Sequence, residues 1–375
     1  MANTLTNLIP DAYRALNVVS REMVGFIPSV QLDPSAEQIA FNQNIRIPLA
    51  PVNSAGRDIT PAMALPTAAY QTIANVNHTL SKNRAFPFSW TFEEMKSVNG
   101  GPGYLTIQQQ QIAQALRAAV NEMEADVANV AYLGASRATG TAGTTPFGST
   151  LGDSAQLRKI LSDNGAPDSD RSLVIDTAAG ASIRTLAQLT KANEAGTAEL
   201  RAQGKLLDLH GFVVRESAQA KTPTSGTGAS YQLNGAVAVG DTTITVDTGS
   251  GTILAGDVVT INGNKYVVAT ALSSGSFTIN APGIVKAAAD NAAVTVNATS
   301  TRNVGFSRNA ILLSTRLPAA PSRDQAIDRQ VITDPVSGIS FEIAEYPGYR
   351  MSTYEVSACW GVTCIKPEHV ATLLG

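Results

Sequence analysis

The sequence predicts an α+β fold in which an all-β module interrupts a host domain that mixes helices and strands. The module is predicted over residues 231–299, where short β-branched runs alternate with glycine-rich turns. One long helix is predicted over about 104–134, and strand patterns occur both before the helix and after the module. A module placed inside another domain indicates that the host keeps a core of its own.

The composition favours a surface that is partly covered by other subunits. The chain has 375 residues, enough for two or three domains and a large core. Only 15% of its residues are charged, against about 25% in an ordinary soluble protein. Interface cores are depleted of charge, although a weakly charged ordinary globule is the alternative.

Charge and hydropathy argue against two classes of partner. The net charge is −3 and no run of Lys or Arg occurs, so tight nucleic-acid binding is not expected. No stretch reaches 18 apolar residues, so no membrane span is expected. The first residues lack a basic start followed by an apolar run, which predicts synthesis in a cytoplasm without a secretory signal.

The N-terminal part predicts an arm followed by an extended hairpin. Residues 6–22 have helical apolar spacing, and the segment 25–34 breaks that helix. Strands are predicted over 41–50 and 71–80, joined by a long tip rich in Pro, Ala and Gly, and a third strand over Phe86–Phe92 follows.

The long helix follows a strong turn at 99–103. Its apolar positions recur mostly at steps of three and four: Ile107, Ile112, Leu116, Ala119, Val120, Met123, Val127 and Val130. We expect this stripe to pack on the chain's own sheet, since the paired charges of a coiled coil are missing. The opposite face, with Gln108–Gln111, Arg117, Glu122 and Glu124, is expected to meet solvent or a neighbour.

The middle of the chain is predicted to form a mixed α/β segment followed by the β-module. A helix over Ser154–Ser162, a strand over 171–176, a helix over 177–193 and a strand over 210–216 are predicted, then a flexible linker at 220–230. We expect a small barrel or sandwich with strands Thr242–Val246, Asp257–Ile261, Lys265–Ala269 and Ser276–Ile279, and a hairpin turn at Asn262–Asn264.

The C-terminal part is predicted to return to the host. The host resumes at Arg302, and residues 303–321 favour a strand or short helix. Two long strands then follow, with their turn at Tyr346–Tyr349 around Pro347 and Gly348, and a short terminal helix closes the chain.

No pattern of chemistry-bearing residues predicts a catalytic, cofactor-binding or metal site, so the protein is expected not to be an enzyme. His78, His210 and His369 are far apart, with His369 in an expected exposed tail, and Glu93–Glu94 indicates a solvated helix start. Nucleophile-elbow, phosphate-loop and dinucleotide-binding patterns are absent. Cys359 and Cys364 are expected to be unpaired thiols, because they are five positions apart along a strand, roughly 17 Å, and their spacing is wrong for zinc.

The order of these elements resembles the major capsid protein of tailed double-stranded-DNA phages, with the fold named after the Hong Kong 97 phage. It is most similar to short-tailed-phage coat proteins that carry an inserted β-domain. The resemblance rests on the long helix YLTIQQQQIAQALRAAVNEMEADVANVAYLG, on LRAQGKLLDLHGFVVRESAQ and NVGFSRNAILLSTRLP around the module, and on the terminal WGVTCIKPEHV.

The resemblance implies a division of the chain into an N-terminal arm (1–34), an extended loop with flanking strands (35–92), a peripheral domain with a spine helix (93–149), the first part of an axial domain (150–220), an inserted β-barrel or sandwich (221–300), the axial return (301–328), and peripheral strands with the C-terminus (329–375). It implies a structural shell protein of the virion, made in a host bacterial cytoplasm, with no cofactor and no membrane. The implied partners are further copies in hexamers and pentamers, a scaffolding protein, a portal protein at one vertex and, in some phages, a decoration protein. The shell would enclose double-stranded DNA without reading its sequence.

One variant of this family closes its shell with Lys–Asn isopeptide bonds between the long loop and the peripheral domain. Lys82 would be the donor here, but the last asparagine of the chain is Asn309. The returning strands therefore contain no acceptor, and a non-covalent shell is expected.

Two other functions remain open from the sequence. An encapsulin-like nanocompartment would share the fold and enclose a cargo enzyme in place of a genome. A β-rich surface, adhesion or tail-associated protein, from a different class, would account for the Thr/Gly-rich module.

Overall fold

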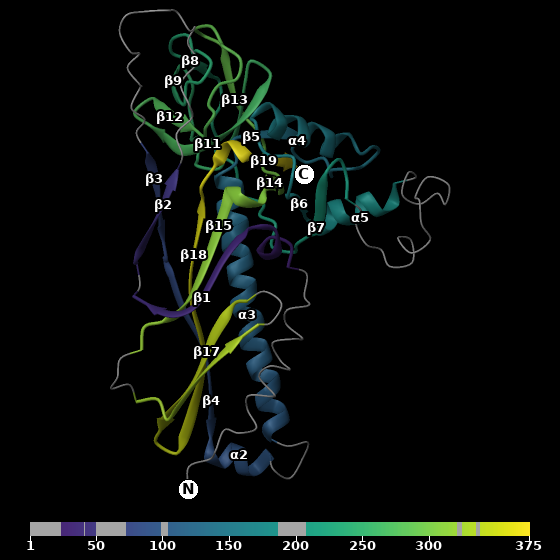
Figure 1. Ribbon diagram of the computed structural model, residues 1–375. Coiled ribbons are helices and arrows are strands. Elements are labelled where there is room, and N and C mark those ends of the chain that lie inside the picture. The colour runs from purple at the N-terminus through teal and green to yellow at the C-terminus, as the bar shows by residue number, and fades with distance from the viewer. Residues whose placement is uncertain are drawn as a thin grey trace, which may run out of the picture.

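The computed structural model describes residues 24–40, 42–49, 73–98, 104–186, 208–320, 325–334 and 338–375. One long helix runs beside long strands, and a β-rich unit lies at one end (Figure 1). The predicted helix at 6–22, the tip of the predicted hairpin and the turn at 99–103 lie outside the described residues.

The long helix is α3 (Tyr104–Leu133), which confirms the predicted long helix in place and length. Its buried residues Ile112, Leu116, Ala119, Met123 and Val127 follow the expected apolar stripe and enter the largest core. The prediction for the polar face is wrong at two positions, because Gln108 and Glu124 are also buried.

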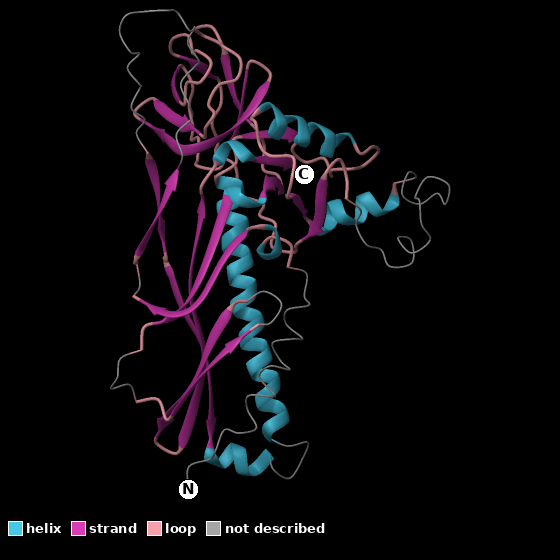
Figure 2. Cartoon of the chain, in the orientation of Figure 1, coloured by secondary structure: helices cyan, strands magenta, loops and turns pink. Residues whose placement is uncertain are grey.

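A six-stranded sheet lies along α3 (Figure 2). Its order is β1 (Gln31–Ile39), β15 (Ile311–Pro318), β18 (Met351–Cys364), β17 (Ser340–Gly348) and β16 (Asp328–Thr333), with β4 (Lys82–Thr91) also paired to β18. β1 runs parallel to β15, and the remaining pairs are antiparallel. β4 starts four residues before the predicted strand, and Phe92 opens the short helix α2 (Phe92–Val98).

An eleven-stranded sheet combines host and module strands. Its host part contains β5 (Arg137–Gly140), β19 (Val370–Leu374), β14 (Arg302–Ser307), β6 (Arg171–Ile175) and β7 (Phe212–Glu216). Helices α4 (Gly152–Asp163) and α5 (Thr177–Thr185) contribute to a second core with β6, β7 and β19. The predicted helix at 154–162 and the strands at 171–176 and 210–216 are thus confirmed. The predicted helix over 177–193 is confirmed as far as Thr185, and the rest of it lies partly outside the described residues.

The module strands are β8 (Tyr231–Leu233), β9 (Thr243–Asp247), β10 (Val258–Ile261), β11 (Asn264–Ser273), β12 (Ser276–Ile279) and β13 (Ala293–Val296). They enclose a third core of their own. The predicted turn is confirmed between β10 and β11, with φ of 47° at Asn262 and 78° at Gly263, the positive values of a type I′ hairpin.

The predicted terminal helix is wrong. Residues 370–374 form β19, a wholly buried strand between β14 and β5. Only a short 3₁₀ turn (Pro367–His369) precedes it, and His369 is half-buried, so the expectation of an exposed tail is also wrong. A five-residue segment with four apolar residues fits helix and strand periodicity equally well, and only its pairing within the sheet decides between the two.

Two further expectations are corrected by hydrogen bonding. Gly348 pairs with Met351, so the β17–β18 turn lies at Tyr349–Arg350, two residues beyond the Pro347–Gly348 centre. The segment 220–230 is held in place, because Lys221 O accepts from Arg302 N at 2.8 Å and Gly226 N donates to the Asp257 carboxylate at 3.1 Å. Its prediction as a flexible linker is therefore wrong.

Candidate functional site

The three histidines lie on separate elements. His78 is in β3 (Ala74–Thr79), His210 in the turn before β7, and His369 in the 3₁₀ turn before β19. The structure does not bring them together. Among the described residues no group of three or more His, Cys, Asp or Glu side chains is arranged to hold a metal ion.

One serine–histidine pair lies at the distance expected of a nucleophile and its base, but its serine is not accessible to a substrate. His210 Nδ1 lies 2.8 Å from Ser154 Oγ. Ser154 is fully buried in α4, and its hydroxyl donates to Leu151 O at 2.8 Å. A nucleophile must reach a substrate with a free lone pair and a transferable proton, so this pair joins α4 to the turn before β7 and does not form a catalytic dyad.

The two cysteines of β18 are free, as predicted. Cys359 is buried, and burial raises the pKa of its thiol. Burial raises the pKa of Cys364 to about 12, so its reactive thiolate form is scarce near neutral pH. Both thiols serve as small packing groups.

The predicted extended hairpin is present as a separate two-stranded sheet. β2 (Asn44–Leu49) pairs antiparallel with β3 over six residue pairs, from Asn44–Thr79 to Leu49–Ala74. The residues of β2 alternate between exposed and half-buried, and the hairpin is anchored to the rest of the chain at one end. There Leu80 is fully buried, and His78 Nδ1 lies 2.8 Å from Thr363 Oγ1 of β18. Burial lowers the pKa of His78, with Arg316 adding to the effect and Asp33 opposing it.

Part of the polar face of α3 contacts β4 and β18 where solvent or a neighbour was expected. Arg84 Nε donates to Glu122 Oε1 at 2.8 Å, and Lys82 Nζ lies 3.6 Å from the same oxygen. Trp360 Nε1 donates to Asp126 Oδ2 at 2.9 Å. The helix is therefore fixed to the sheet by polar contacts as well as by its apolar stripe.

Glu124 is the most deeply buried carboxylate of α3. Its Oε1 accepts from Gly25 N and Phe26 N and from Ser217 Oγ, each at 2.7 Å, and Oε2 accepts from Ile27 N at 2.9 Å. Burial raises the pKa of this carboxyl, while the four donors act in the opposite direction. One side chain thus joins the first described segment, the long helix and the end of β7. In the sequence, the burial of Glu124 is indicated by its place directly after Met123, at the border of the apolar stripe of α3.

Exposed apolar side chains gather at the far end of the six-stranded sheet. Phe92 and Tyr349 are 54% and 92% exposed, and Phe92 N donates to Arg350 O at 3.1 Å, which brings α2 to the β17–β18 turn. Ile327 and Val331, on or beside edge strand β16, are also exposed. Such groups on a sheet edge favour contact with another chain.

The module is joined to the host at the end of α3. β11 pairs with β5 through Lys265–Ala138 and Tyr266–Arg137, so the two sets of strands form one continuous sheet. Asn280 Nδ2 donates to Leu133 O and Ala135 O, each at 2.8 Å. These carbonyls at the helix C-terminus would otherwise lack a partner, so the module completes the end of the helix.

Comparisons with known proteins find similarity only in structure. No family model matches the chain, and no curated protein sequence matches it. A capsid chain of the cyanophage P-SCSP1u aligns over 92% of this chain and 86% of its own, with 12% identity and a TM-score of 0.51. The mature capsid of bacteriophage PhiM1 aligns over 93% and 86% with a TM-score of 0.47 and 12% identity. A virus-like particle from Pyrococcus furiosus aligns over 98% and 100% with a TM-score of 0.43 and 8% identity.

The cyanophage alignment shows that this chain has the fold of that capsid chain. The resemblance to phage capsid proteins is thereby confirmed as a likeness of fold, and the mixed α+β class with it. A shared fold carries no function by itself. No helix among the described residues is long and apolar enough to cross a membrane.

Proposed function

We propose that this chain is the major capsid protein of a tailed double-stranded-DNA phage, a structural subunit that assembles into an icosahedral shell. The observation that carries the proposal is the alignment with a phage capsid chain over 92% of the length, with α3 laid along a sheet of long strands. The burial of His78 and Cys359 and the separation of the three histidines also favour a structural role over a catalytic one.

The parts of the chain acquire roles under this proposal. We assign β2 and β3 to the extended loop, α3 with the six-stranded sheet to the peripheral domain, and β5, β6, β7, β14 and β19 with α4 and α5 to the axial domain. β8–β13 would be the inserted domain on the outer surface. These assignments depart from the division inferred from the sequence, because β1, β4 and β15 pair in the six-stranded sheet and β5 and β19 in the eleven-stranded sheet.

Contacts between copies would form at the hairpin and at the exposed apolar end of the six-stranded sheet. A closed symmetric lattice repeats every contact many times, so individually weak contacts suffice. The low charge of the chain suits such contacts. A scaffolding protein, a portal protein and, in some phages, a decoration protein complete the proposed set of partners.

The shell is proposed to be held without covalent cross-links. Lys82, the donor that the family resemblance implies, is ion-paired to Glu122 and lies 3.8 Å from Asp126. The strands after Asn309 contain no asparagine that could accept it. Boiled, reduced particles should therefore run as monomers on a denaturing gel, whereas a ladder of multimers would contradict this assignment.

The main test is expression of the full chain, with and without its neighbouring genes, followed by electron microscopy. Uniform icosahedral shells support the proposal, and a stable monomer under every condition, co-expressed scaffolding protein included, would count against it. Cargo separates the encapsulin-like alternative: nuclease-protected DNA in native particles indicates a phage, and a co-purifying enzyme indicates a compartment.

A further inference from the structure

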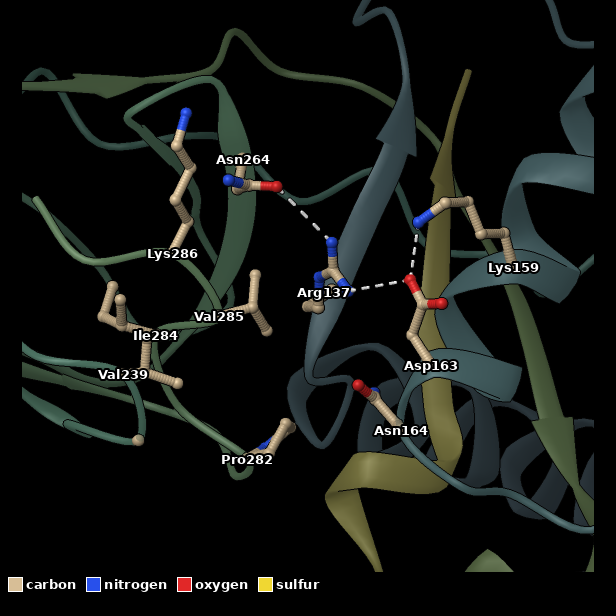
Figure 3. A pocket seen from close by; sticks show the side chains of 11 residues that line it. Arg137, Lys159, Asp163, Asn164, Val239, Asn264, Pro282, Ile284, Val285 and Lys286 are labelled. Carbon is tan, nitrogen blue, oxygen red and sulfur yellow. Dashed lines mark hydrogen bonds and ion pairs between the residues drawn. The ribbon is translucent and has the colours of Figure 1, made fainter.

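A cleft of about 700 Å³ lies where the β-module meets the host. One wall is formed by the module residues Val239, Pro282, Val285 and Lys286. The facing wall comes from β5 and the end of α4 and includes Arg137, Lys159 and Asp163 (Figure 3). The cleft thus has cations on both sides of the junction, with apolar side chains between them on the module side.

Positive charge predominates among the described lining residues. Arg137, Lys159 and Lys286 line the space together with a single carboxylate, Asp163, and the Lys286 side chain extends past Asn264, away from Arg137, in Figure 3. Lys159 Nζ lies 2.6 Å from Asp163 Oδ2, so this carboxylate is already paired with one of the three cations. Lys286 has no ion-pair or hydrogen-bond partner in the part of the chain that the structure describes. A protein of net charge −3 therefore concentrates unneutralised cations at this point.

The guanidinium of Arg137 is poorly satisfied by the protein. Its side chain is only 11% exposed. Nη2 donates to Asn264 Oδ1 at 3.5 Å, Nη1 lies 3.9 Å from Asp163 Oδ2, and Nε is buried without an acceptor. Hydrogen bonds of good strength are near 2.9 Å, and leaving a buried charged donor unsatisfied is costly. The two Nη groups thus have room for a better acceptor than either present neighbour.

We propose that this cleft binds a phosphate-like oxyanion between the module and the host. The planar fork of Arg137 matches the oxygens of such an anion, while Lys159 and Lys286 act as point charges. A polyvalent anion can pair with several cations at once, whereas a single carboxylate neutralises fewer of them. The site does not depend on the proposed shell function.

Binding would fasten the module to the host. Lys286 follows the module segment Pro282–Val285, whereas Arg137 belongs to β5 and Lys159 to α4. An anion that contacts all three side chains adds a bridge beside the short β5–β11 pairing. Occupancy should therefore raise the stability of the junction more than that of the distant six-stranded sheet.

The test uses the purified full chain, inorganic phosphate as the probe, and ionic strength held constant with sodium chloride. We expect saturable phosphate binding by calorimetry and, at ten times the dissociation constant, a rise in Tm of about 2 °C. Lys286→Gln, at an exposed position, should weaken phosphate binding about tenfold, since a charge-assisted contact is lost. Arg137→Gln should weaken it at least as much.

Lys96→Gln, which removes an exposed cation of α2, is the matched control and should leave phosphate binding unchanged. An acetate arm distinguishes phosphate from a lone carboxylate and should give a much smaller response. If Arg137→Gln does not fold, Lys286→Gln still decides. The proposal is overturned if chloride or acetate stabilises the protein as well as phosphate does, or if Lys286→Gln binds phosphate like the wild type.

Discussion

The β8–β13 module and the β2–β3 hairpin both lie outside the six-stranded sheet, but different interactions attach them to the rest of the chain. The module has its own apolar core and joins the host through a shared sheet and the Asn280 contacts. The hairpin forms a separate sheet of two strands and is anchored at one end by His78 and Leu80. Two isolated strands are marginally stable in water, so the hairpin depends on its neighbours.

The difference teaches where each region's stability lies. The module is stabilised from within and in turn completes the C-terminal end of α3. The hairpin presents exposed side chains that its own fold does not use, which suits a surface completed by another copy of the chain. Substitutions in the two regions should accordingly give different patterns of stability and assembly.

The largest effect is expected from Phe277→Ala in the module core. Phe277 is 1% exposed, and truncating a buried phenylalanine costs about 3–5 kcal/mol through lost burial and the cavity left behind. Hydrogen exchange should show lost protection in β8–β13 while β2 and β3 keep theirs. Equal loss of protection in the hairpin would show that the two regions are not independent.

Asn280→Ala tests the connection between module and host. Two carbonyls at the end of α3 lose their donor, and about 2 kcal/mol of unfolding free energy should be lost with them. Asn234→Ala, at an exposed module position, is the control and should change stability by less than about 0.5 kcal/mol. If both variants unfold alike in denaturant, the contact to α3 is not a structural connection.

Some of this arrangement follows from the sequence and some does not. The α3 stripe and the Asn262–Gly263 turn depend on local periodicity and backbone preference, and both were predicted. β19 was missed because its short, mostly apolar sequence becomes a strand only between β5 and β14. The burial of Glu124 depends on the amides of Gly25, Phe26 and Ile27, nearly 100 residues away. The cleft lies between residues of two regions, so no local pattern could indicate it.

Acidification should loosen the hairpin before it affects the module. The pKa of His78 lies below its ordinary 6.5 because of burial. Between these two values the unfolded chain binds more protons, so stability falls as the pH falls through 6.5. Hydrogen exchange of β2 and β3 should therefore be faster near pH 5.5 than near pH 7.5, while the module changes less.

His78→Gln keeps a hydrogen-bonding side chain opposite Thr363 but cannot titrate. It should cost on the order of 1 kcal/mol and abolish the acid-dependent acceleration in the hairpin. His369, whose pKa burial also lowers, contributes with the same sign near β19 and should keep its effect in this variant. An unchanged pH response in β2 and β3 would assign the response to another group.

The smallest effect on stability, with a separate effect on assembly, is expected from Arg46→Glu on β2. Arg46 is exposed and has no ion-pair partner among the described residues, so its replacement should change the free energy of unfolding by less than about 0.5 kcal/mol. If the hairpin lies against another copy, a reversed charge recurs at every equivalent contact of the shell, and like charges across an interface are costly.

Assembly, followed by light scattering, should then require a higher protein concentration, whereas Thr243→Ala, at an exposed position of β9, should assemble normally. Normal assembly of Arg46→Glu would remove this face of the hairpin from the proposed contacts and leave the exposed end of the six-stranded sheet as the surface to test.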